Sequence, residues 1–296
     1  MNDKKINKVN CEILNLTNKF NKTINIIFLI KIIIISLFLH FFFFIGFYIR
    51  KTILTIKVDK KEIKQYKVFY KELKNFISYS QFYEDLILFT LFYDIKNGFY
   101  IDIGANDPND LSITKSFYLR GWYGLNIEPL PAMYNMLIKY RNRDINLQIG
   151  VGEKEGNQIL YANGFSSTLN KNYSNDINEK INISIYTMKY ICNKYIPKGE
   201  IIQFCKIDIE GNEKNALLGY DFINYRPKIF CIESTKPGTT IPTHEEWEDI
   251  LLKNDFSFAY QYKINRYYID NRIKGLRERF ILSDYAIKIF SERVKK

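Results

Sequence analysis

The sequence is poor in the residues that build disulfide-bonded or metal-bound folds. It has only four cysteines and two histidines among 296 residues. None of Cys11, Cys192, Cys205 and Cys231 forms a Cys-x-x-Cys pair or has a histidine at zinc-ligand spacing. We interpret these cysteines as reduced thiols, which excludes a disulfide scaffold and favours a reducing compartment.

Glycine and proline are also scarce, with 14 and 7 residues, whereas hydrophobic residues make up 47% of the chain and charged residues 25%. Such a composition excludes a collagen-like or intrinsically disordered protein, because there is ample apolar side chain to bury. The length fits one large domain with an appendage, or two small domains.

Positive charge is concentrated at the two ends of the chain. Residues 1–75 hold 15 Lys or Arg and 5 Asp or Glu, and residues 272–296 hold 8 and 3, so the segment between them is mildly acidic despite a net charge of +11. A nucleic-acid binder displays positive charge over its folded surface to neutralise phosphates. We therefore expect no nucleic-acid partner.

One long hydrophobic run lies near the N-terminus. The segment from Ile32 to Ile49 contains no Asp, Glu, Lys or Arg, and about 20 apolar residues suffice to span a bilayer. We predict a basic tail over 1–25, a transmembrane helix over 26–49 and a basic juxtamembrane segment over 50–77. The alternatives are an interfacial or buried helix and a signal peptide, although no small-residue cleavage site follows the run.

The lysines and arginines that flank this run predict its orientation. More of them follow the run than precede it, which places the remainder of the chain in the cytoplasm, at the inner membrane if the source is a bacterium. The lipid bilayer is thus an expected partner. The segment 50–74 is either a helix near anionic headgroups or a solvated linker helix.

Alternating helices and short apolar strands follow from about residue 78 onward. We predict strands at 99–103, 124–128, 145–151, 201–209 and 228–233, helices at 80–92, 112–119, 132–140, 213–218 and 245–252, and a C-terminal antiparallel hairpin at 256–262 and 266–270. This alternation predicts an α/β fold with a mostly parallel sheet covered on both faces. The Ser- and Asn-rich stretch 163–182 is expected to be a loop or lid.

Two strand ends carry residues suited to a nucleoside. The first strand runs into Asp102, Gly104 and Asn106, and the second ends in Glu128. Ligands bind beyond the carboxyl ends of parallel strands, where a carboxylate can accept hydrogen bonds from a ribose diol. Residues 104–109 lack the G-x-G-x-x-G pattern that holds a pyrophosphate, and an acidic loop suits a cationic ligand instead.

A charged cluster ends the strand predicted at 201–209. Period-two alternation places Lys206, Asp208 and Glu210 on one side of that strand, where they either pair as a structural cluster or face a cleft. The next strand ends in Glu233, and the loop after it carries His244, which is either a base on the substrate side or a helix-capping residue.

Taken together, these motifs resemble the FkbM family of methyltransferases. The resemblance runs in order over residues 78–270 and rests on six stretches: Ser80-Gln81-x-x-Glu84-Asp85, residues 99–108, Arg120-Gly-Trp122 with Asn126-Ile-Glu-Pro129, Lys206-Ile-Asp-Ile-Glu-Gly-x-Glu213, Arg226-Pro227, and Asn265-Arg-Tyr-Tyr268. It departs at Tyr83, where family members tend to have Gly, and at Tyr262-Lys263, which replace an Asp-Gly.

The resemblance implies a class I, Rossmann-like methyltransferase domain over 78–296, with a seven-stranded sheet whose last strand is antiparallel. It further implies S-adenosylmethionine as the cofactor and a hydroxyl, often on a sugar or glycan, as the methyl acceptor. Carried over by position, it assigns cofactor binding to Asp102, Gly104, Asn106 and Glu128.

For the chemistry we expect Asp208 or His244 to take the acceptor proton, with Lys206 and Glu210 orienting the base or the substrate. A divalent metal held by Asp208 and Glu210 is a further hypothesis, since carboxylates suit Mg²⁺. The competing interpretations are a membrane-anchored scaffold that keeps the fold without catalysis, and an oxidoreductase on a similar sheet, which the absent pyrophosphate loop disfavours.

Overall fold

The computed structural model describes residues 60–173 and 179–294. The chain divides into two units, Met1–Asp59 and Lys60–Lys296, and the fold below is that of the second. The predicted membrane helix over 26–49 lies outside the described residues. Within the described part of the chain, no helix is long and apolar enough to cross a bilayer.

The domain is built on a seven-stranded sheet in the order β3-β2-β1-β7-β8-β10-β9. Its strands are β1 (Phe99–Ile103), β2 (Tyr123–Ile127), β3 (Ile145–Leu147), β7 (Ile202–Ile207), β8 (Ile229–Glu233), β9 (Phe256–Tyr262) and β10 (Asn265–Asp270). All neighbouring pairs are parallel except β10 with β8 and β10 with β9. Only β10 therefore runs against the rest, which confirms the predicted mostly parallel sheet with its C-terminal hairpin.

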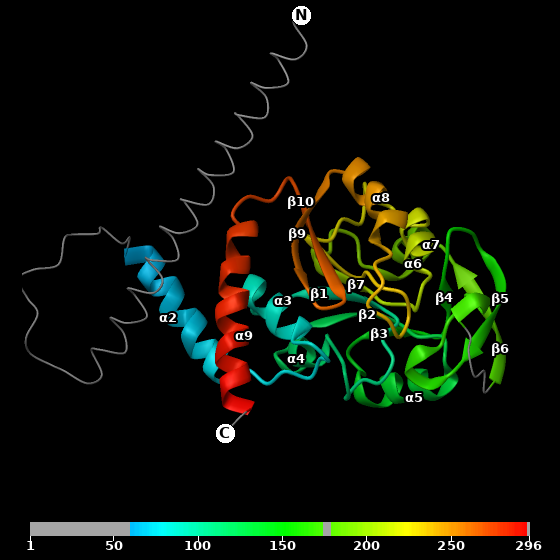
Figure 1. The fold of residues 1–296 in the computed structure, drawn as a ribbon, viewed down its shortest axis with the longest axis horizontal. Coiled ribbons are helices and arrows are strands. Elements are labelled where there is room, and N and C mark those ends of the chain that lie inside the picture. The colour runs from blue at the N-terminus through cyan, green and yellow to red at the C-terminus, as the bar shows by residue number, and fades with distance from the viewer. Residues whose placement is uncertain (1–59, 174–178, 295–296) are drawn as a thin grey trace, which may run out of the picture. The chain divides into compact units, whose positions relative to one another are not determined.

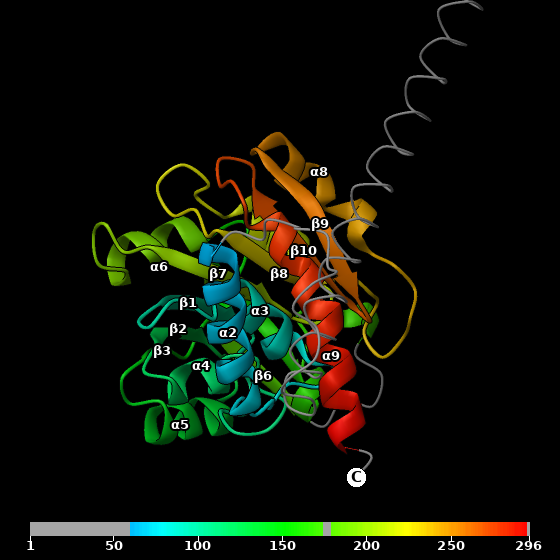
Figure 2. The same ribbon diagram turned by 90° about the vertical axis from the view of Figure 1, so that its left-hand side faces the viewer.

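Helices cover both faces of this sheet (Figures 1 and 2). They are α2 (Lys60–Lys74), α3 (Glu84–Phe92), α4 (Lys115–Leu119), α5 (Pro131–Tyr140), α6 (Met188–Tyr195), α7 (Glu213–Leu218), α8 (Glu248–Lys253) and α9 (Phe280–Val294). The sheet is buried from both sides, so its central strands are rich in β-branched and aromatic residues and have no exposed position, as in FYIDI of β1.

Two hydrophobic cores lie on the opposite faces of the sheet. On one face Tyr100 and Phe204 pack with apolar side chains of α2, α3, α4 and α9. On the other face Ile101 and Cys205 pack with side chains of α6, α7 and α8. Successive strand residues thus alternate between the two cores, as the two-residue repeat of a β-strand requires.

β1 lies where the strand order reverses, because the chain leaves β1 toward one face and β7 toward the other. Phe117 of α4 is in the first core, whereas Ala216 and Leu217 of α7 are in the second. The connections that follow the two adjacent strands therefore diverge. Divergence at such a switch point leaves a crevice at the carboxyl ends of the strands.

A second, three-stranded sheet has the order β4-β6-β5. It consists of β4 (Gly150–Val151), β5 (Gly156–Ala162) and β6 (Glu179–Tyr186), and the short 3₁₀ turns η1 (Gly164–Ser166) and η2 (Lys171–Tyr173) follow β5. We call residues 156–173 and 179–186 the arm. The prediction that 163–182 is only a loop or lid was thus incomplete, since β6 begins at Glu179, and the predicted strand 145–151 is split between the two sheets.

The strand predicted at 201–209 ends earlier than expected. β7 stops at Ile207, and the backbone turns at Glu210 and Gly211, whose φ angles are 53° and 92°. Asp208 and Glu210 therefore lie in the connection to α7, and the prediction that they share a strand face with Lys206 was wrong. Helices α6 and α9 were not predicted at all.

The helix predicted from residue 80 begins at Glu84, because the residues before it fold around a buried carboxylate. Asp85 accepts hydrogen bonds from the hydroxyls of Ser78 and Ser80 at 2.6 and 2.7 Å and from the Tyr79 N–H at 2.7 Å. Ser80 is thus a partner of Asp85. The N-cap of α3 is Tyr83, whose side chain accepts no hydrogen bond from a helix N–H.

Both departures from the family pattern fall at backbone positions that favour glycine. Tyr83 has a φ of 64° and Lys263 a φ of 52°, in the left-handed region. Tyr83 offsets part of this strain through its ring, which packs 6.3 Å from that of Phe290. Tyr83 and Lys263 therefore keep a left-handed backbone conformation that glycine adopts freely, at a cost in backbone strain.

Candidate functional site

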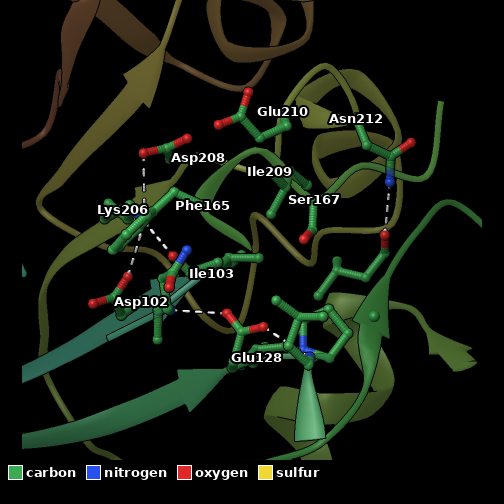
Figure 3. Close-up of a pocket in the computed structure, with 18 of the residues that line it drawn as sticks. Asp102, Ile103, Glu128, Phe165, Ser167, Lys206, Asp208, Ile209, Glu210 and Asn212 are labelled. Atoms are coloured by element: carbon green, nitrogen blue, oxygen red, sulfur yellow. Dashed lines mark hydrogen bonds and ion pairs between the residues drawn. The ribbon is translucent and has the colours of Figure 1, made fainter. Parts of the chain in front are cut away.

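An open pocket lies at the carboxyl ends of β1, β2 and β7, where the strand order reverses (Figure 3). Its volume is about 1010 Å³ when the space open to solvent is counted. One side is polar and contains the strand-end acids. The other side is apolar and includes Ile103, Ile127, Val151, Leu160, Phe165, Leu169, Ile183 and Ile209.

The polar side is organised around a buried ion pair between β1 and β7. Asp102 and Lys206 are neighbours in the strand register, and Lys206 Nζ lies 3.4 Å from Asp102 Oδ1. The other oxygen of Asp102 accepts a hydrogen bond from the Thr114 hydroxyl at 2.9 Å. The side chains of Asp102 and Lys206 are only 2% and 7% exposed. The direct partners of Asp102 are therefore Lys206 and Thr114, the residue before α4.

The turn after β1 requires glycine at position 104. Gly104 has a φ of 77°, and a Cβ built there would lie 1.9 Å from the Asp208 carbonyl oxygen. The N–H groups of Gly104 and Ala105 both donate to the Ile127 carbonyl, at 3.0 and 3.1 Å. The absence of a side chain lets the β1 and β7 connections meet and leaves the pocket floor as backbone.

Glu128, the residue after β2, presents a carboxylate that is fixed by backbone donors. Its two oxygens accept from the N–H groups of Asn106 and Leu130, each at 2.8 Å. Burial raises the pKa of Glu128, and these two hydrogen bonds oppose that rise. Each oxygen keeps a second lone pair, so Glu128 can still accept hydrogen bonds from a ligand diol.

Lys206, Asp208 and Glu210 meet at the rim of the pocket. Lys206 Nζ lies 3.7 Å from Asp208 Oδ2, and the Asp208 side chain is 34% exposed. Burial acts to lower the pKa of Lys206, but the carboxylates of Asp102 and Asp208 outweigh it and raise that pKa. Lys206 is therefore a permanent cation in neutral solution and cannot serve as a base.

Carboxyl groups behind this rim hold protons more tightly than usual. Burial, followed by the negative charges of Asp208 and Glu213, raises the pKa of Glu210 to about 8. Burial likewise raises the pKa of Glu213 to about 7, although its Oε1 accepts from the N–H groups of Ile209 and Gly211. The rim thus contains acids that are partly protonated near neutrality.

The arm forms the wall opposite the strand ends. Gly164, Phe165, Ser167 and Leu169 line the pocket, and Phe165 is 51% exposed. The Thr168 hydroxyl donates to the Glu210 carbonyl at 2.7 Å. The arm and the connection after β7 therefore hold each other in place across the pocket.

Seven of the eight site residues predicted from the sequence line this pocket: Asp102, Gly104, Asn106, Glu128, Lys206, Asp208 and Glu210. His244 does not. It opens the 3₁₀ turn η3 (His244–Glu246) after β8 and is half-buried there. Sequence reasoning missed Thr114 and Phe165; Thr114 had a signal in its position at the start of a helix, but Phe165 had none.

A metal ion finds no ready site here. Among the residues that the structure describes, no three His, Cys, Asp or Glu side chains converge as metal ligands. Asp208 and Glu210 are two carboxylates on a turn, with Lys206 already beside Asp208. The residues present therefore do not fit the magnesium hypothesis, and we assign no step to a metal.

The sheet order, the glycine turn after β1 and the acid after β2 together define a Rossmann-like methyltransferase class of fold. The family model of the methyltransferase FkbM domain matches residues 102–258. The chain belongs to this methyltransferase family. No curated protein matches the chain.

Proposed function

We propose that the protein uses S-adenosylmethionine to methylate a hydroxyl group of a sugar, glycan or glycolipid acceptor. The observation that carries the proposal is the Glu128 carboxylate, held by two backbone N–H groups beside the Gly104 turn and facing the pocket. This is the arrangement expected for a site that grips a ribose diol.

Further features of the pocket fit such a nucleoside. Asn106 Oδ1 is buried without a hydrogen-bond partner, and a ligand donor would satisfy it. The apolar side, which includes Ile127, Val151 and Leu160, suits an adenine ring. The cofactor would supply a methyl group on a cationic sulfur, and the acids at the rim complement that charge.

Asp208 is our candidate for the base that takes the acceptor proton. It is the partly exposed carboxylate at the rim, whereas His244 does not line the pocket. Positioning of the acceptor hydroxyl close to the methyl group is expected to contribute most to the rate, and a carboxylate within reach removes the proton as the new bond forms.

A sugar-like acceptor agrees with the chemistry of the pocket mouth. The exposed ring of Phe165 offers a flat apolar surface for the C–H face of a sugar. Asp208 and Glu210 on the same pocket offer acceptors for its hydroxyl groups. Neutral polyhydroxylated acceptors are therefore favoured over flat apolar ones.

A calorimetric titration tests the cofactor assignment. We expect S-adenosylmethionine to bind and NADH not to bind, and we expect Glu128→Gln to weaken binding at least about tenfold, because one ribose hydrogen bond to a charged acceptor is lost. Glu153→Ala, an exposed residue away from the pocket, is the control and should bind normally. Binding of NADH in place of S-adenosylmethionine would refute the assignment.

The acceptor is sought by transferring a labelled methyl group from S-adenosylmethionine into a membrane and glycan extract. We expect the label in a sugar-containing fraction and its absence with the Asp208→Asn variant. Label in protein or nucleic acid alone would contradict the acceptor class. Cofactor binding without transfer to any fraction would support the non-catalytic alternative.

The membrane partner is the second part of the proposal. The uncharged run from Ile32 to Ile49 supports a bilayer anchor that keeps the domain at the cytoplasmic face, near lipid-linked sugars. We expect the full-length protein to remain with membranes after an alkaline wash. Its appearance in the soluble fraction without that wash would exclude the anchor.

A further inference from the structure

Two carboxyl groups lie at the carboxyl ends of adjacent strands, Glu233 as the last residue of β8 and Asp208 directly after β7. Ile207, the last residue of β7, pairs with Ile232 of β8 in parallel register, so the next residues, Asp208 and Glu233, emerge side by side at the carboxyl edge of the sheet. Asp208 lines the pocket, whereas Glu233 is not among the residues that line it.

Glu233 is buried with an acceptor atom that has nothing to bind. Its exposure is 6%, and its Oε2 atom has no hydrogen-bond partner. Asn265 lies opposite Glu233 on β10, but its amide donates to Glu84 Oε1 at 2.9 Å. An ionised glutamate left in this way would be costly, whereas a protonated one needs only a single acceptor.

The charges around Glu233 also favour its protonated form. The negative charges of Asp208 and Glu210, in the connection between β7 and α7, and of Glu213, at the start of α7, act on Glu233, and Glu84 of α3 accepts the hydrogen bond of Asn265. Lys206 is already paired with Asp102 and Asp208. Burial, followed by the negative charges of Asp208, Glu210 and Glu213, raises the pKa of Glu233 well above its ordinary value.

We propose that Asp208 and Glu233 form a carboxylate–carboxylic acid pair that shares one proton, in which Glu233 is the positioning residue that aims Asp208 at the acceptor. The inference rests on the proposed function and deepens it. The Glu233 O–H donates to one oxygen of Asp208, and the other oxygen of Asp208 is left to face the acceptor hydroxyl.

In the transfer step the bond between the methyl carbon and the cofactor sulfur breaks and a bond to the acceptor oxygen forms. The acceptor O–H proton passes to Asp208, whose partial exposure lets it release that proton to water. Glu233 keeps its own proton throughout. Protons and electrons balance without any further reactant.

The shared proton is tested first by unfolding, which needs no acceptor. An acid whose pKa is raised in the folded state gives stability that is present at low pH and lost as pH rises, because folding takes up a proton. The free energy of unfolding of Glu233→Gln relative to wild type is therefore expected to increase between about pH 5 and about pH 9. In an Asp208→Asn background this increase should shrink.

The control for this experiment is Glu245→Gln, an exposed glutamate on the η3 turn, whose stability relative to wild type should not depend on pH. A pH-independent difference for Glu233→Gln would overturn the inference. So would an equal increase with and without the Asp208→Asn change, since the two groups would then be uncoupled.

The kinetics of methyl transfer test the positioning role. In Glu233→Leu, Asp208 loses the group that orients it, so kcat should fall about tenfold while KM stays near the wild-type value; Glu233→Gln restores a donor and should restore kcat. An unchanged kcat in Glu233→Leu would refute the positioning role. Loss of transfer in the wild type at every pH would instead refute the proposed function and leave the unfolding result to decide on the shared proton.

Discussion

Lys206 and Asp102 form a buried ion pair, with 3.4 Å between Nζ and Oδ1, that joins the two strands flanking the switch point of the sheet. Lys206 also donates to the carbonyl of Gly104 and approaches Asp208. One ammonium group therefore ties the end of β1, the glycine turn and the pocket rim together. Its removal is expected to affect both stability and ligand binding.

Replacement of Lys206 by methionine should lower the free energy of unfolding by about 3–5 kcal/mol, because Asp102 would remain as an unpaired buried charge. Denaturant unfolding measures this change. The exposed pair Lys253–Asp249 is the control, and Lys253→Met should cost less than about 1 kcal/mol. Recovery of stability in the double variant Asp102→Asn/Lys206→Met is expected; an additive loss would contradict the pairing.

Gly104→Ala should destabilise the protein far more than Gly199→Ala, because the two glycines have similar backbone angles but only Gly199 has space for a Cβ atom. Gly104 and Gly199 have φ angles of 77° and 81°, yet a Cβ meets the Asp208 carbonyl only at position 104. We expect Gly199→Ala to cost about 1 kcal/mol and Gly104→Ala to cost several kcal/mol through displacement of the β7 connection. Thermal unfolding and cofactor titration of both variants measure the difference. Equal losses of stability and of cofactor affinity in the two variants would show that the Asp208 carbonyl moves away from the added Cβ without an energetic penalty.

Glycine at position 263 should stabilise the protein, because Lys263 has a left-handed φ of 52° in the turn between β9 and β10. Lys263→Gly is expected to raise the free energy of unfolding by about 0.5–1 kcal/mol. Lys263→Ala removes the same charged side chain but keeps a Cβ, so its free energy of unfolding should stay near that of the wild type. Equal effects of the two variants would mean that backbone strain is absent here.

Stability should gain from neutralising Glu213 only at higher pH. Its pKa is raised to about 7 in the folded protein, so this carboxyl takes up a proton on folding. The wild-type protein therefore loses stability as the pH rises from the ordinary pKa of glutamate toward 7. Relative to wild type, the free energy of unfolding of Glu213→Gln should increase by about 1.4 kcal/mol per pH unit over that range and should stay constant above it. Unfolding at a series of pH values measures this gain, with exposed Glu246→Gln as the control, and a constant gain at all pH values would contradict the raised pKa.

Much of the central sheet was predictable because its strands are short apolar runs that end in polar or turn residues. β1 and β8 have no exposed residue, and their apolar sequences are typical of strands buried on both faces. Since parallel strands end at the same edge, the positions of Asp102 and Glu128 in the sequence were enough to predict that both residues lie at the same edge of the sheet, where they line one pocket. The reversal at β10 followed from the short turn before it.

The errors arose where local periodicity continued past a change in backbone direction. Lys206, Asp208 and Glu210 keep a two-residue spacing, but the strand ends at Ile207 and the backbone then turns at Glu210 and Gly211. The reverse error affected β6, where the alternating Ile181, Ile183 and Ile185 were hidden by neighbouring polar residues. His244 could not be placed, because the course of a loop depends on tertiary contacts that spacing does not encode.

The arm contacts the connection between β7 and α7 at Glu210 and Gly211, neither of which is a predicted cofactor ligand. Thr168 holds the Glu210 carbonyl, and the ring of Tyr173 lies where a side chain on Gly211 would be. Because the arm belongs to a separate sheet, its residues 164–169 can differ in sequence without a change at the ends of β1, β2 and β7. Under the proposed function, we expect exchange of these residues to change the preferred acceptor while cofactor binding is retained.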